Sequence, residues 1–159
     1  MSSQYLSEQH QLPESLSAQQ ILEKAADILT LLFQNRDAYT EPESVKRFLC
    51  CKLAKHEREV FAVMFLDNKH QLIHYQELFQ GTIDAAIVYP REVVKAALTY
   101  NAAAVIFAHN HPSGVADASV SDKRITRRLV DALALVDIRV LDHIIVGEHC
   151  SSFAELGLL

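Results

Sequence analysis

The fold of this chain is decided by one stretch, AAAVIFAHNHP at residues 102–112. An apolar run that ends at a proline-containing turn is typical of a buried strand, which we predict over 102–108. Side chains alternate between the two faces of a strand. His109 and His111 are therefore expected to point the same way, and Asn110 the opposite way. The pattern places two imidazoles together where the strand ends.

Outward from this stretch, helical and strand periodicities alternate along the chain. Hydrophobic spacing predicts four helices, over 18–34, 43–56, 90–101 and 122–136, and four further strands, over 59–67, 70–79, 85–89 and 138–146. This order predicts an α/β domain, with a mixed β-sheet flanked by helices. Residues 147–159 are expected to be mostly irregular.

Two serines are expected to cap helices. Ser17 and Gln20 have the spacing of a capping box at the start of helix 18–34, and Ser121 precedes the helix that begins at Asp122. The sequence also divides into two regions. We interpret residues 1–42 as a polar leader with an N-terminal helix, and 43–159 as the domain that carries the function.

Composition excludes several classes of protein. The chain has 159 residues, 50% of them hydrophobic, and a net charge of −5. Its length suits one domain, and no apolar run is long enough for a membrane span. The N-terminus lacks the basic and apolar regions of a signal peptide, and three cysteines without a C-x-x-C pair suit a reducing compartment. We therefore expect a cytoplasmic protein with no membrane partner, and the negative charge disfavours nucleic acid as its main ligand.

A third potential metal ligand follows the histidine pair. Ten residues separate His111 from Asp122, which is enough for a loop to return and begin a helix facing the imidazoles. Two histidines and one carboxylate are the ligands of a catalytic rather than a structural zinc site, because the fourth position stays open for water. The same three ligands can hold iron(II).

Hydrolysis at such a site also needs a proton carrier. Glu59, at the start of a predicted strand, is the candidate acid/base, and the Ser119 hydroxyl is placed to approach a developing oxyanion. Simpler interpretations stay open at this point. Histidine pairs on strands are often surface residues, Asp122 can be a helix cap, and Ser119 can be an ordinary loop hydroxyl.

These residues resemble a known family. The H-x-H pair with Ser119-x-x-Asp122 is similar to the JAMM metalloprotease signature, and further stretches across 44–159 resemble the RadC family of bacteria, in particular the short members found in prophages and genomic islands. One departure is visible, since the family usually has proline where this chain has Ala118. The stretches that carry the resemblance are Glu59-Val-Phe61, Leu66-Asp67, Glu77-Leu-Phe-Gln-Gly-Thr82, Pro90-Arg-Glu92, Asn101-Ala-Ala-Ala104, His109-Asn-His-Pro-Ser-Gly114 and Leu141-Asp-His-Ile-Ile-Val146.

The resemblance implies a JAMM/MPN fold, related in layout to cytidine deaminases, and a zinc metallopeptidase activity. It implies one zinc ion on His109, His111 and Asp122, with Glu59 as acid/base and Ser119 as a transition-state stabiliser. Glu57 is the alternative to Glu59. We favour Glu59 because it precedes a phenylalanine by two residues, as in the relatives.

Two further groups have alternative interpretations. Asp142 and His143, in the last predicted strand, can orient a metal ligand or simply form a buried, hydrogen-bonded pair. Four cations on one face of helix 122–136 can form a nucleic-acid or acidic-partner patch, or a solvated surface whose charge Asp131 partly offsets. These cations are Lys123, Arg124, Arg127 and Arg128.

Three functions are consistent with the sequence. The first is a zinc-dependent hydrolase that cleaves a peptide or isopeptide bond in a peptide or protein substrate. The second is a DNA-associated accessory protein, linked to DNA repair or mobile elements, which the basic helix favours. The third is a metal-binding scaffold without turnover, which predicts bound zinc and no peptide cleavage.

Overall fold

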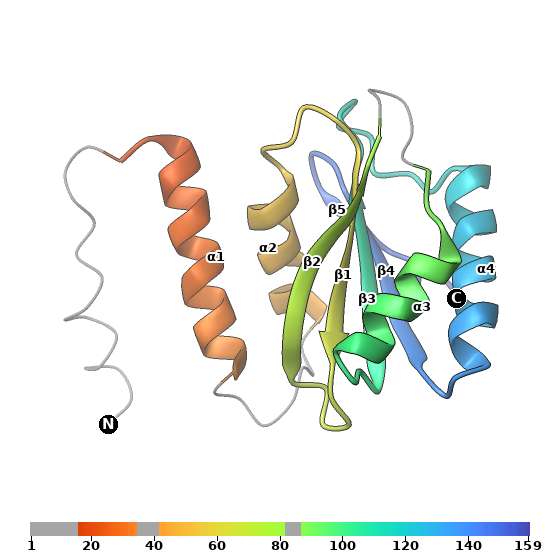
Figure 1. The fold of residues 1–159 in the computed structure, drawn as a ribbon. Helices are drawn as coiled ribbons and strands as arrows, with labels where there is room; N and C mark the ends of the chain where they lie inside the picture. The colour runs from red at the N-terminus through yellow and green to blue at the C-terminus, as the bar shows by residue number, and fades with distance from the viewer. Residues whose placement is uncertain (1–15, 35–41, 82–86) are drawn as a thin grey trace.

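The structure is a computed structural model that describes residues 16–34, 42–81 and 87–159. It is an α/β fold built on a mixed, five-stranded sheet with helices on both faces (Figure 1). The elements are α1 (Ala18–Gln34), α2 (Pro42–Leu53), β1 (Val60–Leu66), β2 (Leu72–Gln80), α3 (Pro90–Thr99), β3 (Ala104–Asn110), α4 (Val120–Ala134), β4 (Arg139–Val146) and β5 (Cys150–Ser152).

The strands lie in the order β2-β1-β3-β4-β5. β1 is antiparallel to β2 and β3, β3 and β4 are parallel, and β5 is antiparallel to β4. β1 and β3 are central strands and are buried along their whole length, because side chains cover both faces of the sheet. The predicted α/β class with a mixed, helix-flanked sheet is confirmed.

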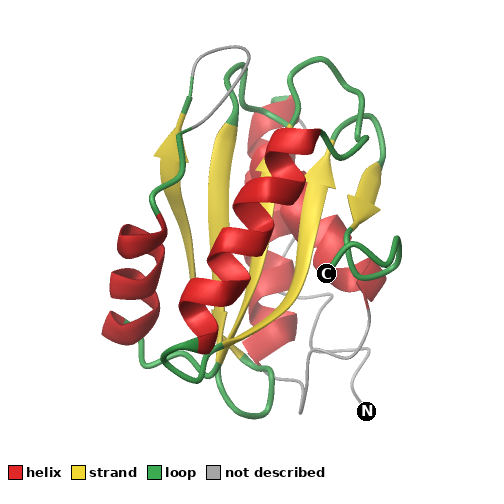
Figure 2. Cartoon of the chain, turned by 90° about the vertical axis from the view of Figure 1, so that its right-hand side faces the viewer, coloured by secondary structure: helices red, strands yellow, loops and turns green. Residues whose placement is uncertain are grey.

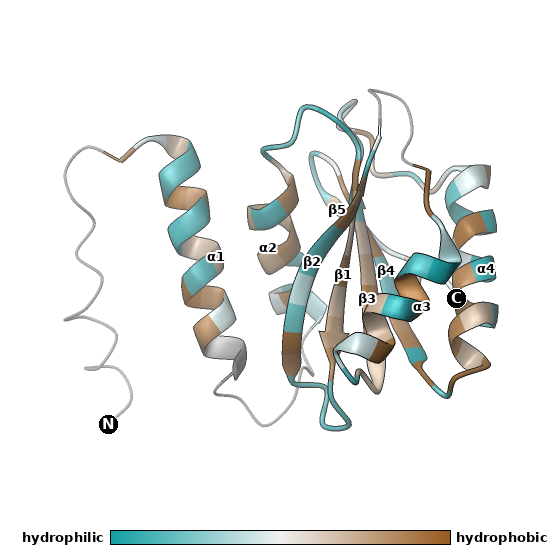
Figure 3. Ribbon diagram, viewed as in Figure 1, coloured by the Kyte–Doolittle hydropathy of each residue, from teal (hydrophilic) through white to brown (hydrophobic). Residues whose placement is uncertain are grey.

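Two hydrophobic clusters hold the layers together. α2 packs on one face of the sheet, with α1 outside it, and α3 and α4 pack on the other face. A view from the α4 side shows the strands lying behind that helix (Figure 2). The hydropathy colouring shows apolar residues along much of the central strands β1 and β3, whereas β2 and the helices mix apolar and polar residues (Figure 3). Burial of these two apolar faces is the main force that stabilises the fold.

The alternation along β3 positions the site. Val105 and Phe107 belong to the cluster under α3 and α4, whereas Ile106 and Ala108 belong to the cluster under α2. His109 continues the first series, and Asn110 continues the second. The prediction that the side chains of His109 and Asn110 point to opposite faces of the sheet is therefore confirmed.

Several predicted boundaries are corrected by the structure. The N-cap of α4 is Ser119 rather than Ser121, so that helix begins earlier and Asp122 is its third residue. β3 extends to Asn110, two residues beyond the predicted end, and the tail expected to be irregular contains β5. Residues 87–89, predicted as strand, are irregular, since the chain there passes directly into Pro90 of α3.

Other predictions are confirmed or are not tested. Ser17 and Gln20 form the expected capping box at α1, with Ser17 N donating to Gln20 Oε1 and Gln20 N donating to Ser17 Oγ. The first 15 residues of the predicted leader region, and residues 85–86 of the predicted strand 85–89, lie outside the described residues. Within the described ranges, no helix has the length and apolar character needed to span a bilayer.

Candidate metal centre

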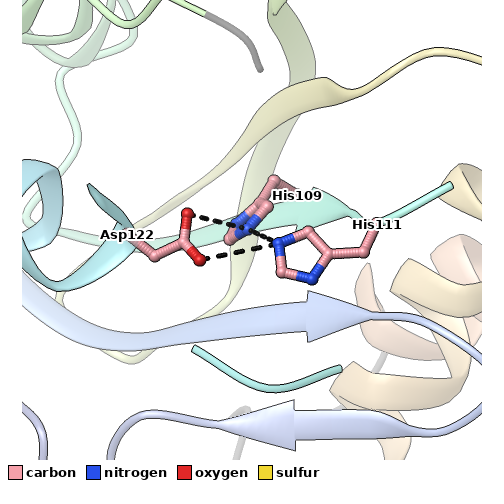
Figure 4. A group of neighbouring side chains, drawn as sticks. All are labelled: His109, His111 and Asp122. Atoms are coloured by element: carbon pink, nitrogen blue, oxygen red, sulfur yellow. Dashed lines mark hydrogen bonds and ion pairs between the residues drawn. The ribbon is translucent and has the colours of Figure 1, made fainter. Parts of the chain in front are cut away.

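Three side chains from two elements converge beside the end of β3 (Figure 4). His109 is the penultimate residue of β3, His111 follows the strand, and Asp122 belongs to the first turn of α4. One ligand atom from each lies within 4.8 Å of the other two. His109 is 2% exposed and Asp122 is 8% exposed, so water is largely excluded from one side of the group.

Hydrogen bonds assign the tautomer of His109. Thr126 Oγ1 donates its only proton to the carbonyl oxygen of Asp122, at 2.6 Å, and therefore accepts a hydrogen bond from His143 Nδ1, also at 2.6 Å. His143 Nε2 must then accept from His109 Nδ1, which is 2.8 Å away. A neutral histidine carries one ring proton. His109 Nε2 is consequently left with a free lone pair, and it faces His111 and Asp122.

The tautomer of His111 is assigned in the same way. His111 Nδ1 donates to the backbone carbonyl of Val115 at 2.6 Å, so its Nε2 presents the lone pair. The two Nε2 atoms lie 2.9 Å apart. Two neutral lone pairs at this distance repel each other unless a cation or a proton lies between them. The donor set therefore fits a metal ion, since two ligand atoms on a tetrahedral zinc are about 3.3 Å apart.

Asp122 completes the group, and α4 fixes its carboxylate. Ser119 N donates to Asp122 Oδ2 at 2.8 Å, and Asp122 N donates to Ser119 Oγ at 3.1 Å, which forms a capping box. Asp122 Oδ1 lies 3.3 Å from His109 Nε2, and Oδ2 lies 3.5 Å from His111 Nε2. Asp122 is thus both a capping-box residue and a potential metal ligand. The capping contact holds its carboxylate in place.

The electrostatics of the group favour a cation. Burial alone would raise the pKa of the Asp122 carboxyl. When a proton takes the place of a cation on the ring nitrogens, hydrogen bonds from His109 and His111 outweigh burial and hold that pKa well below its usual range. The hydrogen bond to Asp122 raises the pKa of His111, with a smaller contribution from the charge of Glu59. A proton is therefore held here more tightly than on an ordinary histidine, and a metal ion must displace it.

The two candidate acid/base residues lie in different places. Glu59 lines a cleft of about 550 Å³ together with all three potential ligands and Ser119. Glu57 lines a second hollow beside Asn110 and Gly114, which includes His111 but neither His109 nor Asp122. Of the two, only the cleft with Glu59 contains all three potential ligands. The residues lining this cleft are Glu59, Phe61, Ile87, Val88, His109, His111, Pro112, Ser113, Ser119, Ser121, Asp122, Arg124, Ile125, Arg128 and His143.

Asp142 and His143 have different surroundings. His143 is fully buried and contacts His109, as described above. Burial is the largest cause that lowers the pKa of His143, and it keeps the ring neutral. Asp142 instead accepts from Ser152 Oγ at 2.6 Å and from Ala154 N at 3.0 Å. Asp142 therefore secures the turn after β5 and makes no side-chain contact with the three potential ligands.

The four predicted basic residues of α4 divide into two pairs. Arg124 and Arg128 line the cleft. Lys123 and Arg127 do not, and Arg127 Nε lies 3.3 Å from Asp131 Oδ1. The helix therefore presents two arginines, rather than four cations, to the candidate site.

Two residues that organise the site were not predicted from the sequence. Thr126 lies four residues after Asp122 on α4, which is the spacing of neighbours on one helix face and was the available signal. Asn110 is buried, and its side chain bonds three backbone groups where the chain enters β1, those of His56, Arg58 and Val60. It thereby holds the segment that carries Glu59.

Comparison with known proteins agrees with this geometry. Residues 39–158 match the family described as "RadC-like JAB domain". A UPF0758 protein of Vibrio cholerae is 58% identical over 151 residues, covering 95% of this chain and 96% of that protein, and a second one is 59% identical over 139 residues, covering 87% and 88%. A UPF0758 protein of Thioalkalivibrio sulfidiphilus is 58% identical over 141 residues, which are 89% of this chain and 63% of that longer protein. The chain belongs to the RadC family and folds as its JAB domain, with a His-His-Asp group that can hold a metal ion.

Proposed function

We propose that this chain is a zinc-dependent hydrolase of the JAMM type that cleaves a peptide or isopeptide bond. One observation carries the proposal. The hydrogen-bond partners of His109 and His111 leave both Nε2 lone pairs facing each other beside an ionised Asp122, in a cleft that also contains Glu59. A scaffold needs only the ligands, whereas a hydrolase also needs a carboxylate outside the ligand group.

Each residue has a chemical role in this proposal. A zinc ion held by His109, His111 and Asp122 would supply Lewis acidity and lower the pKa of water to about 7. Glu59 takes the proton from the attacking water and returns it to the leaving amine. Ser119 Oγ already accepts from Asp122 N, so its hydroxyl proton is available for the oxyanion that forms on the substrate carbonyl.

The test separates metal binding from hydrolysis. Elemental analysis of the purified protein should find about one zinc per chain, and His109→Ala and His111→Ala should each lose it. A peptide library should be cleaved by the zinc-loaded protein, and Glu59→Gln should reduce cleavage by about 10²–10⁴-fold while keeping the zinc. Glu57→Gln is the matched control and should cleave like the wild type. Zinc content that is unchanged in both histidine variants would refute the site, and unchanged cleavage by Glu59→Gln would refute the mechanism.

A further inference from the structure

One stripe of α4 forms a wall of the cleft. Ser121, Arg124, Ile125 and Arg128 all line it, and their spacing of three, four and seven residues places them on one face of the helix. Asp122, the potential ligand, lies at the beginning of the same helix. The cleft therefore extends from the ligand group along α4, and its wall there carries two arginines.

The two arginines are available to a ligand. Among the described residues, neither Arg124 nor Arg128 makes an ion pair or a side-chain hydrogen bond, whereas Arg127 on the neighbouring face pairs with Asp131. A guanidinium is always charged, and its planar fork fits a carboxylate or a phosphate. Both side chains are exposed, so they can reach a bound molecule without unpacking the core.

The helix geometry sets how far from the reacting bond such a group would bind. Arg124 is two residues and Arg128 six residues beyond Asp122, which is about 3 Å and about 9 Å along the helix axis. An extended peptide advances about 3.3 Å per residue. A carboxylate held by these arginines would therefore lie within about three residues of the bond at the ligand group.

The charges favour a carboxylate over a nucleic-acid backbone. Strong binding to DNA or RNA neutralises a row of phosphates with many cations. Here two arginines line a cleft that also contains Glu59, and the whole chain has a net charge of −5. Two cations confined to one wall suit a single, localised acidic group.

We propose that the cleft selects peptides that carry a carboxylate within about three residues of the scissile bond, and that Arg124 and Arg128 bind this carboxylate. The carboxylate is either an Asp or Glu side chain or the C-terminus of the peptide. The existence of a scissile bond in this proposal rests on the proposed hydrolase function. The recognition of an acidic peptide by the two arginines can be measured without any turnover.

Binding is measured first, by fluorescence anisotropy of labelled peptides on the zinc-loaded protein. The set contains a Glu-containing peptide with an amidated C-terminus, its Gln counterpart, the Gln peptide with a free C-terminus, and a short single-stranded DNA. We expect one carboxylate peptide to bind about tenfold more tightly than the neutral peptide, which is the scale of two partly exposed charged pairs. Arg124→Gln with Arg128→Gln should remove this difference, and the control Lys123→Gln with Arg127→Gln should keep it.

Cleavage is measured second, on a peptide library whose products are sequenced by mass spectrometry. The wild type and the control pair should show enrichment of acidic residues, or of free C-termini, near the cleaved bond, and the Arg124→Gln with Arg128→Gln variant should lose it. Each outcome is informative. Carboxylate-selective binding without cleavage would support the arginine site and refute the hydrolase. Cleavage without a preference for acidic residues would support the hydrolase and refute the arginine site. DNA binding that depends on Arg124 and Arg128 and exceeds peptide binding, or equal binding of all the peptides, would overturn the proposal.

Discussion

His143 Nε2 lies 2.8 Å from His109 Nδ1, and this contact decides which nitrogen of His109 faces the potential metal site. The donor and acceptor in this contact are set by Thr126. Its Oγ1 donates to the Asp122 carbonyl, so it can only accept a hydrogen bond from His143 Nδ1. One threonine thus connects the backbone at one potential ligand with the tautomer of another. Partners of this kind raise ligand basicity and fix ring orientation.

Replacing Thr126 with valine should therefore weaken metal binding without removing a ligand. Valine keeps the shape of the side chain but leaves His143 Nδ1 without its acceptor. The ring nitrogens that carry the protons of His143 and His109 are then no longer fixed. We expect zinc affinity to fall by about 10–100-fold. Competition with a chromophoric chelator measures this.

The matched control is Thr99→Val on α3. Thr99 Oγ1 makes the same kind of hydrogen bond to the carbonyl four residues earlier, at 2.8 Å to Lys95 O, but it is exposed and belongs to a different helix. Its substitution should leave zinc affinity unchanged. Equal zinc affinities of the Thr126→Val variant and the wild type would show that the hydrogen bonds from Thr126 through His143 to His109 have no influence on metal binding.

How much the sequence predicts depends on the range of each interaction. The pairing of His109 with His111 was predictable because the two-residue period of a strand is a property of the backbone. The Thr126–His143 contact joins residues 17 apart in sequence and depends on how α4 packs against β4, which no local pattern specifies. The capping serine was a missed local signal, because Ser119 and Asp122 have the capping-box spacing.

Removing the Asn110 side chain should loosen the segment that carries Glu59. Its Oδ1 accepts from Val60 N at 2.8 Å, and its Nδ2 donates to His56 O and Arg58 O at 3.2 and 3.0 Å. Asn110→Ala leaves these backbone groups without partners, and we expect a loss of about 3 kcal/mol in the free energy of unfolding. Urea denaturation measures the loss.

The same variant separates acid/base positioning from metal binding. Hydrolysis should fall more than zinc affinity, because Glu59 lies in the loosened segment and the ligand atoms do not. Asn68→Ala, in the exposed turn between β1 and β2, is the control and should change stability by less than about 0.5 kcal/mol. An Asn110→Ala protein as stable as the wild type would contradict this role.

Gly147 should be required for the loop that holds His111. A Cβ at this position would collide with the carbonyl of Gly114, and Glu148 N donates to that same carbonyl at 2.7 Å. Gly147→Ala must therefore shift the loop that supplies Val115 O to His111. We expect a loss of about 1–3 kcal/mol in unfolding free energy together with weaker zinc binding.

Gly157→Ala provides the comparison for this effect. Gly157 has a φ of +67°, so alanine is strained there too, but its Cβ would meet nothing within 4 Å. This variant should lose some stability and keep its zinc affinity. If both glycine variants bind zinc as the wild type does, the loop does not control the orientation of His111.

The cysteine pair on the opposite face of the sheet gives a prediction of pH dependence away from the metal centre. Cys50 on α2 and Cys150 on β5 are adjacent, and a hydrogen bond from Cys150 lowers the pKa of the Cys50 thiol to about 7, although burial opposes this. Burial raises the pKa of the neighbouring Cys51. Because the thiolate is the reactive form, alkylation of Cys50 by iodoacetamide should rise through a midpoint near pH 7, while Cys51 reacts slowly until higher pH. Peptide mapping of pulse-labelled protein measures both rates. Cys150→Ala removes the donor and should move the midpoint for Cys50 to higher pH, so an unchanged midpoint in that variant would contradict the assigned cause.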